Sequence, residues 1–258
     1  MLIRRLLTGV ALGATLVAVT AAGAADVAKP RFAVYGNTLT DTPMTEGGVK
    51  YTMRTVKWPT GTVRVMNFTK AAGVMHKLTD ETEIFVLKGS VTATVNGSPV
   101  VLKTGDVASH ATGVLKTGDA EDTQVISWTV GSLTPDAKPA VVRAADAPEA
   151  GNPEVLKVKR YEFPGNSIRV ATMVAGSKNG PTSAKTDSLI YIKEGHVRFI
   201  EGDETHDLHA GDFVWEEAGV THRWEHADGG SFVTTTGIPK GAAPMTPAEA
   251  VDRPEMKK

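Results

Sequence analysis

The chain has 258 residues, of which 41% are hydrophobic and 22% are charged, a composition typical of a folded protein rather than a disordered one. Its formal net charge of −1 creates no basic field that would attract nucleic acid or anionic lipid, so a nucleic-acid partner is not expected. Cysteine is absent, which excludes disulfides, thiol nucleophiles and thiolate metal sites.

The first 25 residues have the features of an export signal. Arg4 and Arg5 precede an apolar run from Leu6 to Ala22, and the small residues 22–25 offer a cleavage site before Asp26. A single anchoring helix is the alternative, but the run is at the short end for a membrane span and polar chain follows directly. We predict cleavage, which lowers the formal charge from −1 to −3 by removing two arginines. The mature protein is then expected to be periplasmic or secreted, with no stable membrane span.

Short runs of alternating apolar residues follow, separated by Gly, Pro, Asn and Asp. Residues 63–68, 83–87 and 91–95 have the β-branched, period-two pattern of strands. Asn96-Gly97 is a tight hairpin signal, because both turn positions tolerate a positive φ. No long helical pattern interrupts these runs, so the predicted fold class is all-β.

The chain repeats itself at an offset of 105 to 106 residues. The matching sets are Trp58-Pro59, 63–65, 84–89, Gly105-Asp106, Gly113-Val114 and Gly131 in the first half, and Phe163-Pro164, 168–170, 190–195, Gly211-Asp212, Gly219-Val220 and Gly237 in the second. Each repeat has roughly 100 residues, which is enough for one small barrel.

These patterns predict five segments. They are a signal peptide at 1–25, an N-terminal domain at 26–132, a linker or strap rich in Ala, Pro, Asp and Glu at 133–153, a C-terminal domain at 154–240 and a tail at 241–258. A short helix is predicted to start in the tail at Thr246-Pro247.

The glycine-containing segments of both repeats resemble the two motifs of the cupin superfamily. They are Leu87-Lys-Gly89, Gly105-Asp106 and Gly113 in the first repeat, and Ile192-Lys-Glu-Gly195, Gly211-Asp212 and Gly219-Val-Thr-His222 in the second. The resemblance covers residues 50–131 and 160–237 and implies two tandem jelly-roll β-barrels, the arrangement called a bicupin. It leaves the function open, because this scaffold carries oxygenases, isomerases, lyases, sugar binders and storage proteins.

The resemblance also implies a transition-metal site made by two His and a Glu from the first motif and a His from the second. In the first repeat His76 stands at the first His position, but the second is Leu78. Thr82 stands at the Glu position, and a one-residue bulge would turn the neighbouring Glu83 inward. Lys116 replaces the second-motif His.

A further histidine of the first repeat, His110, lies on the strand before the Gly113 turn and is a candidate to point into the barrel. In the second repeat only His222 stands at a family metal position, with Glu216 nearby and Ser188 where the Glu would be. Both ligand sets are incomplete, so a divalent transition metal is left open as a cofactor. Its candidate ligands are His76, Glu83 and His222, and structural roles for the two histidines are equally open.

Arg64 and Arg169 recur at the same place in the repeat, each between two β-branched apolar residues. Neighbours on a strand point to opposite faces. Each arginine is therefore either directed into a barrel, where it could hold a carboxylate through two hydrogen bonds, or directed to solvent.

Three functions fit these residues. The first is an isomerase or lyase acting by acid–base chemistry on a sugar acid or other small carboxylate in the N-terminal barrel. The expected catalytic residues are His76, Glu83, His110 and Lys116, and the expected substrate-binding residues are Arg64, Arg169, His222 and Glu216. The alternatives are a non-catalytic small-molecule binding protein and a metal-dependent dioxygenase. A homodimer formed through exposed β edges is also open.

Overall fold

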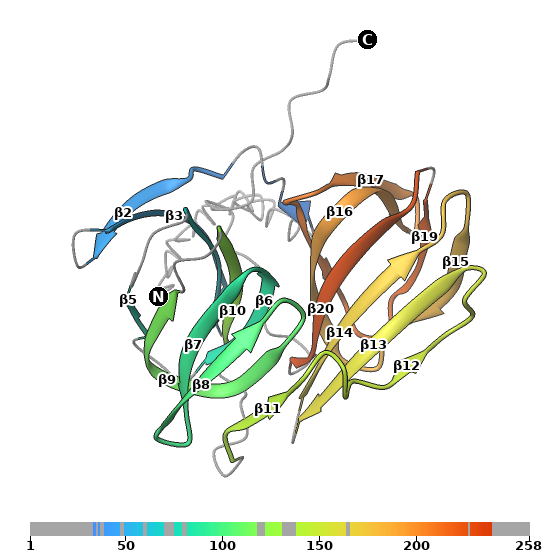
Figure 1. Ribbon diagram of the computed structural model, residues 1–258. Helices are drawn as coiled ribbons and strands as arrows, with labels where there is room; N and C mark the ends of the chain where they lie inside the picture. Colours follow the sequence, from blue (N-terminus) through green and yellow to red (C-terminus); the bar gives the residue numbers. More distant parts are fainter. Residues whose placement is uncertain are drawn as a thin grey trace, which may run out of the picture.

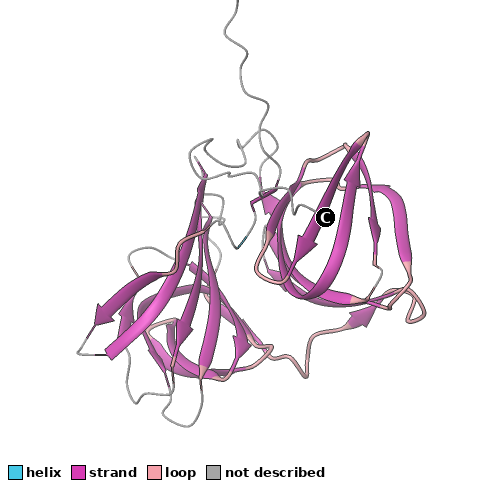
Figure 2. Cartoon of the chain, turned by 90° about the horizontal axis from the view of Figure 1, so that it is seen from above, coloured by secondary structure: helices cyan, strands magenta, loops and turns pink. Residues whose placement is uncertain are grey.

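Two sheets of ten strands each, curled into neighbouring barrels, make up the described part of the chain (Figure 1). The computed structural model describes residues 33–34, 36, 39–46, 49–58, 61–69, 75–78, 82–117, 122–130, 138–163, 166–226 and 228–238. These residues contain no α-helix, and seen from above the strands surround two separate interiors (Figure 2). The predicted all-β jelly-roll class is confirmed. No helix in these ranges is long and apolar enough to span a membrane.

The first barrel contains the strands β2 to β11. They are β2 (Thr42–Glu46), β3 (Val49–Trp58), β4 (Gly61–Phe68), β5 (Met75–Lys77), β6 (Thr82–Lys88), β7 (Ser90–Val95), β8 (Ser98–Lys103), β9 (Val107–Thr117), β10 (Thr123–Val130) and β11 (Ala140–Val142). The main path runs β2-β3-β4-β10-β6-β9-β7-β8, with β5 and β11 both paired to β9.

The second barrel contains β1 and the strands from β12 onward. They are β1 (Ala33–Val34), β12 (Glu149–Ala150), β13 (Leu156–Phe163), β14 (Asn166–Met173), β15 (Lys178–Ser183), β16 (Asp187–Glu201), β17 (Glu204–His209), β18 (Phe213–Glu216), β19 (Thr221–Glu225) and β20 (Gly230–Ile238). Its main path runs β1-β18-β16-β20-β14-β13-β12, and β15, β17 and β19 complete the wall.

The sequence repeat is visible strand by strand. The strand β14 begins and ends 105 residues after β4, and β17 begins and ends 106 residues after β8. The turn between β7 and β8 is the expected hairpin, since Asn96 and Gly97 have φ values of 51° and 73°.

Alternation along the strands gives each barrel an inner face and a face against its neighbour. Met66 and Ile84 belong to the apolar interior of the first barrel, and Ile190 belongs to that of the second. A third cluster, which includes the fully buried Trp128 and Trp215, draws residues from both barrels. The two barrels therefore share one continuous apolar interface.

Each barrel receives a short strand from the segment that precedes the other barrel. We call residues 33–39 the arm and residues 138–147 the strap. In the arm, β1 pairs with β18 of the second barrel. In the strap, β11 pairs with β9 of the first barrel. The linker predicted at 133–153 is thus partly strand, since β11 and β12 lie within it.

The arm and the strap are anchored in the same way, each by the Gly-Asp turn of the barrel that it joins. The backbone N–H of Gly36 donates to Asp212 Oδ1 at 2.6 Å, and the backbone N–H of Ala144 donates to Asp106 Oδ1 at 2.9 Å. Asp106 and Asp212 belong to the two repeat-related Gly-Asp turns found in the sequence. Their buried carboxylates therefore hold the two barrels together as well as shaping each turn.

We expect Gly36→Ala to destabilise the second barrel by roughly 2 kcal/mol, because a Cβ at this buried position would lie 2.3 Å from the carbonyl oxygen of Gly211. Urea unfolding followed by tryptophan fluorescence measures the change. Thr40→Ala, at an exposed position just after the arm, is the matched control. An unchanged unfolding midpoint for Gly36→Ala would show that the arm does not support the barrel.

Several sequence predictions fall outside the described residues. They are the signal peptide at 1–25, the tail at 241–258 with its short helix, and the side chain of His76.

Candidate functional site

The inner face of the second barrel lines a cavity of about 550 Å³ that is partly open to solvent. This volume is in the range of small-molecule sites. Apolar side chains such as Trp224 and Phe232 line its floor, and polar side chains from β13, β14, β18 and β19 line the rest. The loop between β15 and β16 contributes Lys185 to the lining.

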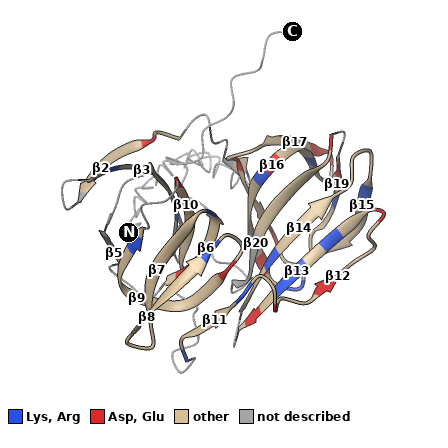
Figure 3. Cartoon of the chain, in the orientation of Figure 1, with Lys and Arg blue, Asp and Glu red and all other residues tan. Residues whose placement is uncertain are grey.

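Two arginines face each other across neighbouring strands of this cavity. Arg160 of β13 is the direct cross-strand partner of Arg169 of β14, and both line the cavity. Arg169 points inward because its neighbour Ile168 lies in the inter-barrel cluster while Ala171 lies in the interior. Lys and Arg positions along β13 are visible in Figure 3.

Neither arginine has an acidic partner among the described residues, and the buried Nε of Arg169 has no hydrogen-bond partner there. Like charges placed directly opposite each other on a sheet repel. An unsatisfied buried donor costs about 1–3 kcal/mol. Arg160 is exposed, so solvent screens part of this repulsion, and the cost falls mainly on Arg169.

A histidine–glutamate pair lies on the other side of the same cavity. His222 Nε2 is 2.6 Å from Glu216 Oε1, and the side chains are 1% and 13% exposed. His222 Nδ1–H donates to the carbonyl oxygen of Val220 at 3.3 Å. Burial lowers the pKa of His222, but the hydrogen bond and the charge of Glu216 outweigh it, so the pKa is raised overall. Glu216 thus holds the proton on His222 to a higher pH than a free imidazole would keep it.

A second carboxyl lies behind the histidine. Glu201, at the end of β16, is the direct cross-strand partner of His222. Its Oε2 is buried with no partner among the described residues. Burial raises the pKa of Glu201, and the neighbouring Glu217, Glu204 and Glu216 add to this against the opposing effect of His222.

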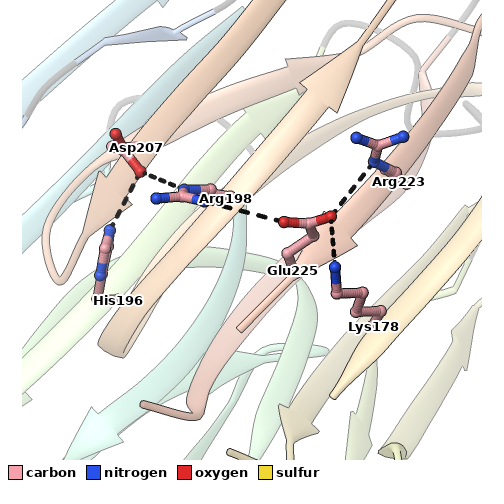
Figure 4. Close-up of polar contacts among 6 residues, drawn as sticks. All are labelled: Lys178, His196, Arg198, Asp207, Arg223 and Glu225. Atoms are coloured by element: carbon pink, nitrogen blue, oxygen red, sulfur yellow. Dashed lines mark hydrogen bonds and ion pairs between the residues drawn. The ribbon is translucent and has the colours of Figure 1, made fainter. Parts of the chain in front are cut away.

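The outer face of the same wall has the opposite character, because its cations are paired with acids (Figure 4). Lys178, Glu225, Arg198 and Asp207 stand in one row across β15, β19, β16 and β17. Lys178 Nζ lies 3.2 Å from Glu225 Oε1, and Arg198 Nε lies 3.1 Å from Asp207 Oδ1. Arg223 and His196 make further contacts, at 3.5 Å with Glu225 and 3.4 Å with Asp207. The cations of this outer network are therefore paired, unlike the two arginines of the inner face.

A small hollow of about 190 Å³ adjoins this network, and its lining includes His226. His226 is 2% exposed, and neither ring nitrogen has a hydrogen-bond partner in the described part of the chain. Burial lowers its pKa to about 4, with a smaller effect from His196.

We expect the stability of the protein to fall as the pH is lowered from 6.5 to about 4, because the unfolded chain protonates His226 in this range and the folded chain does not. The shift corresponds to at most about 3 kcal/mol. Urea unfolding at pH 6.5 and at pH 4.5 measures it. His226→Leu should flatten this dependence, and an equally steep pH dependence in that variant would contradict the assignment.

The predicted residues of the first barrel whose side chains the structure describes do not converge in the same way. Glu83 is fully buried and pairs with Trp128, so it lies on the face toward the second barrel rather than inside the first. The bulge expected in β6 lies instead in β9, where the register shifts around Ser109 and His110. The alternation of β6 is therefore intact, and Thr82 rather than Glu83 lies on the inner face.

Lys116 is exposed, whereas its neighbours Leu115 and Thr117 are buried. It points away from the interior because β9 continues as one strand, whereas the second barrel turns between β18 and β19 before His222. His110 is buried in the bulge with a φ of 56°, and its Nδ1 lies 2.7 Å from Ser109 Oγ. The backbone of His76, in β5, pairs with that of Leu115 in β9.

The structure thus brings together Arg169, Glu216 and His222, all predicted as substrate-binding residues. It adds Arg160 and Lys185, which were not predicted from the sequence. A usable signal for Arg160 was the alternation of Leu156, Val158 and Arg160 on one face of a strand.

The donor atoms of the second barrel do not fit the transition metal that the family resemblance implies. Ser188 and Thr182 line the cavity near His222, and the histidine's Nε2 is already engaged by Glu216. Within the described ranges, no group of three or more His, Asp or Glu is arranged to hold a metal ion. We therefore derive no chemical step through a metal in this barrel.

Comparison with known proteins agrees with this architecture. The family model described as "Cupin domain" matches residues 169–235. A search of curated proteins finds no match. AerE from Microcystis aeruginosa is similar in structure, with a TM-score of 0.65 and 10% identity, covering 80% of this chain and 98% of that chain.

Two solved enzymes are similar over most of their length. Streptomyces albus HEPD with 2-hydroxyethylphosphonate and Fe(II) bound has a TM-score of 0.66 and 10% identity, covering 84% of this chain and 78% of that one. The formate complex of Lactobacillus farciminis oxalate decarboxylase has a TM-score of 0.62 and 12% identity, covering 83% and 88%. At such identities the likeness shows the fold alone.

Fold and cavity together define a two-barrel all-β protein with a small-molecule cavity in its second barrel. Residues 169–235 match the cupin domain model, and the whole chain has the same overall fold as these solved structures.

Proposed function

We propose that the second barrel binds a small carboxylate and transfers a proton to or from it. The observation that carries this proposal is the facing pair Arg160 and Arg169, unpaired among the described residues, in the same cavity as the His222–Glu216 pair. The acid of the latter pair is balanced by its histidine, so the cationic wall leaves the cavity with a positive charge. A carboxylate matches the planar fork of a guanidinium through two parallel hydrogen bonds.

The His222–Glu216 pair supplies the acid–base function. A substrate carboxylate held by Arg169 places the carbon next to it within the cavity that His222 also lines. Removal of a proton from that carbon and its return elsewhere is isomerisation. If the pair instead gives that proton to a hydroxyl on the neighbouring carbon, water leaves, a carbon–carbon double bond forms, and the reaction is that of a lyase. The small acids bound in two of the similar structures, formate and 2-hydroxyethylphosphonate, support an anionic ligand.

The chemistry is therefore assigned to the second barrel rather than to the first. A non-catalytic binding protein is the second candidate. It is favoured because His222 Nε2 is already bound to Glu216. We further propose that the protein is exported, on the basis of its N-terminal sequence. N-terminal sequencing of the protein recovered from the periplasm or medium tests that point, with a start near Asp26 expected.

The function is tested with a panel of sugar acids and small hydroxy acids, compared with their amides and with neutral sugars. The carboxylates are expected to raise the melting temperature, and the amides are not. Bound carboxylates are then incubated in D₂O, and deuterium at the carbon next to the carboxylate is measured by NMR. Incorporation that is lost in His222→Asn supports acid–base catalysis. Binding without incorporation over many hours supports the binding protein instead, and binding of amides as tightly as acids would refute both.

A further inference from the structure

The repeat-related arginine of the first barrel also points inward. Arg64 of β4 pairs with Ser127 of β10, and Ser127 pairs on its other side with Ile84, which belongs to the interior of the first barrel. The two neighbours of Arg64, Val63 and Val65, lie in the inter-barrel cluster. Of the two orientations open from the sequence, the structure therefore has the inward one in both barrels.

Among the described residues, hydroxyl groups rather than acids surround Arg64. Arg64 is half-buried, and its one hydrogen bond among the described residues joins NH1 to Thr129 Oγ1 at 3.3 Å. Ser127 is 1% exposed, and its Oγ has no hydrogen-bond partner there. Thr82, which is 2% exposed, lies on the same inner face and donates to the carbonyl oxygen of Ala111 at 3.4 Å.

A guanidinium on the inner wall of a barrel with no acid beside it is costly unless something compensates it. Two residues further along β4, on the same face, Met66 belongs to the apolar interior. The polar groups are therefore confined to one end of the barrel. An unpartnered buried hydroxyl next to an unpaired guanidinium offers two of the contacts that one carboxylate group uses.

We propose that the first barrel holds a second carboxylate site, centred on Arg64 and independent of the site in the second barrel. Arg64 occupies the position of Arg169, and Ser127 and Thr129 supply hydroxyls beside it. The cross-strand partner of Arg64 on β3 is Thr55, whereas that of Arg169 is Arg160. The first site therefore has one guanidinium instead of two, and it selects a singly charged, hydroxyl-bearing carboxylate with lower affinity than the second.

The test is calorimetric titration of the full chain with gluconate and with glycolate, with the Nε–H signals of the arginines followed by NMR. The wild type is expected to show two classes of site. Arg64→Gln should weaken the lower-affinity class roughly tenfold or more and leave the other unchanged. Arg169→Gln should do the reverse. Lys103→Gln, which removes a charge from the exposed side of the first barrel, is the matched control and should change neither.

Arg64→Lys keeps the charge without the planar fork and guards against misfolding of Arg64→Gln. It should also weaken the first site alone. A single class of site that is lost in Arg169→Gln and unaffected by both Arg64 variants would overturn this inference and leave the proposed function standing. Loss of the lower-affinity class alone in Arg64→Gln, with no effect of Arg169→Gln, would instead refute the second barrel's assignment. An Arg64 Nε–H signal that neither probe moves at high millimolar concentration also overturns the inference.

Discussion

The Arg169→Gln variant is expected to lose roughly 100-fold in affinity for the best carboxylate of the second barrel. Arg169 stands on the inner wall opposite Arg160, and no acid among the described residues competes for it. Glutamine keeps most of the side chain's length but removes the charge and the planar fork, and with them the two parallel hydrogen bonds to the ligand. Isothermal titration calorimetry measures the loss.

The same variant should be more stable than the wild type when no ligand is present, by about 1 kcal/mol, because it removes a buried unsatisfied donor and a like-charge pair. This combination separates a binding residue from a structural one. If Arg169 only supported the fold, its replacement would lower the free energy of unfolding and affinity would fall with it. Arg223→Gln, an exposed arginine of the same barrel that faces outward, is the matched control and should leave affinity unchanged.

The Glu216→Gln variant is expected to lower the pKa of His222 from above its ordinary value of 6.5 to below it. Burial then acts on the imidazole without the opposing charge and hydrogen bond of the carboxylate. The carbon-bound ring protons of His222, assigned by comparison with His222→Asn, report this pKa in an NMR titration. An unchanged titration curve would show that Glu216 does not hold the proton on His222.

The stability of Glu216→Gln should follow the same logic. A histidine whose pKa is raised by folding adds stability that is fully present below pH 6.5 and is lost as the pH rises through the raised value. We therefore expect the variant to be less stable than the wild type by roughly 3 kcal/mol at pH 5, with the difference shrinking at higher pH. Urea unfolding at pH 5, 7 and 9 measures this, and a difference that grows with pH would contradict it.

The architecture was accessible from the sequence because duplicated glycine turns need no tertiary information to be recognised. Gly105-Asp106 and Gly211-Asp212 mark the same turn twice, and the strands between such turns follow from alternation. The pairing of the arm could not be predicted in this way, because β1 has only two residues. It pairs with β18 through Ala33 with Val214 and Val34 with Phe213, residues that lie 181 and 179 positions apart along the chain.

The candidate site was only partly accessible for a similar reason. Arg169, Glu216 and His222 could be singled out by repeat position and chemistry. The offset of 106 residues also matched Lys116 to His222, but the bulge at His110 and the continuous strand β9 set the lysine on the outer side. Arg160 was missed because the repeat places Thr55 at its position, and only the cross-strand register reveals its neighbour.

The exchange of the arm and the strap has a consequence for how the two halves can be separated. A cut between residues 132 and 138 leaves the first half with β1, which it does not use, and without β11, which it needs. The second half then has the reverse deficiency, and each also loses its part of the shared apolar interface. Each of the two repeat-related barrels thus includes a strand from the segment that precedes the other. The halves are better regarded as complementing fragments of one folding unit than as modules that could be shuffled, lost or transplanted alone.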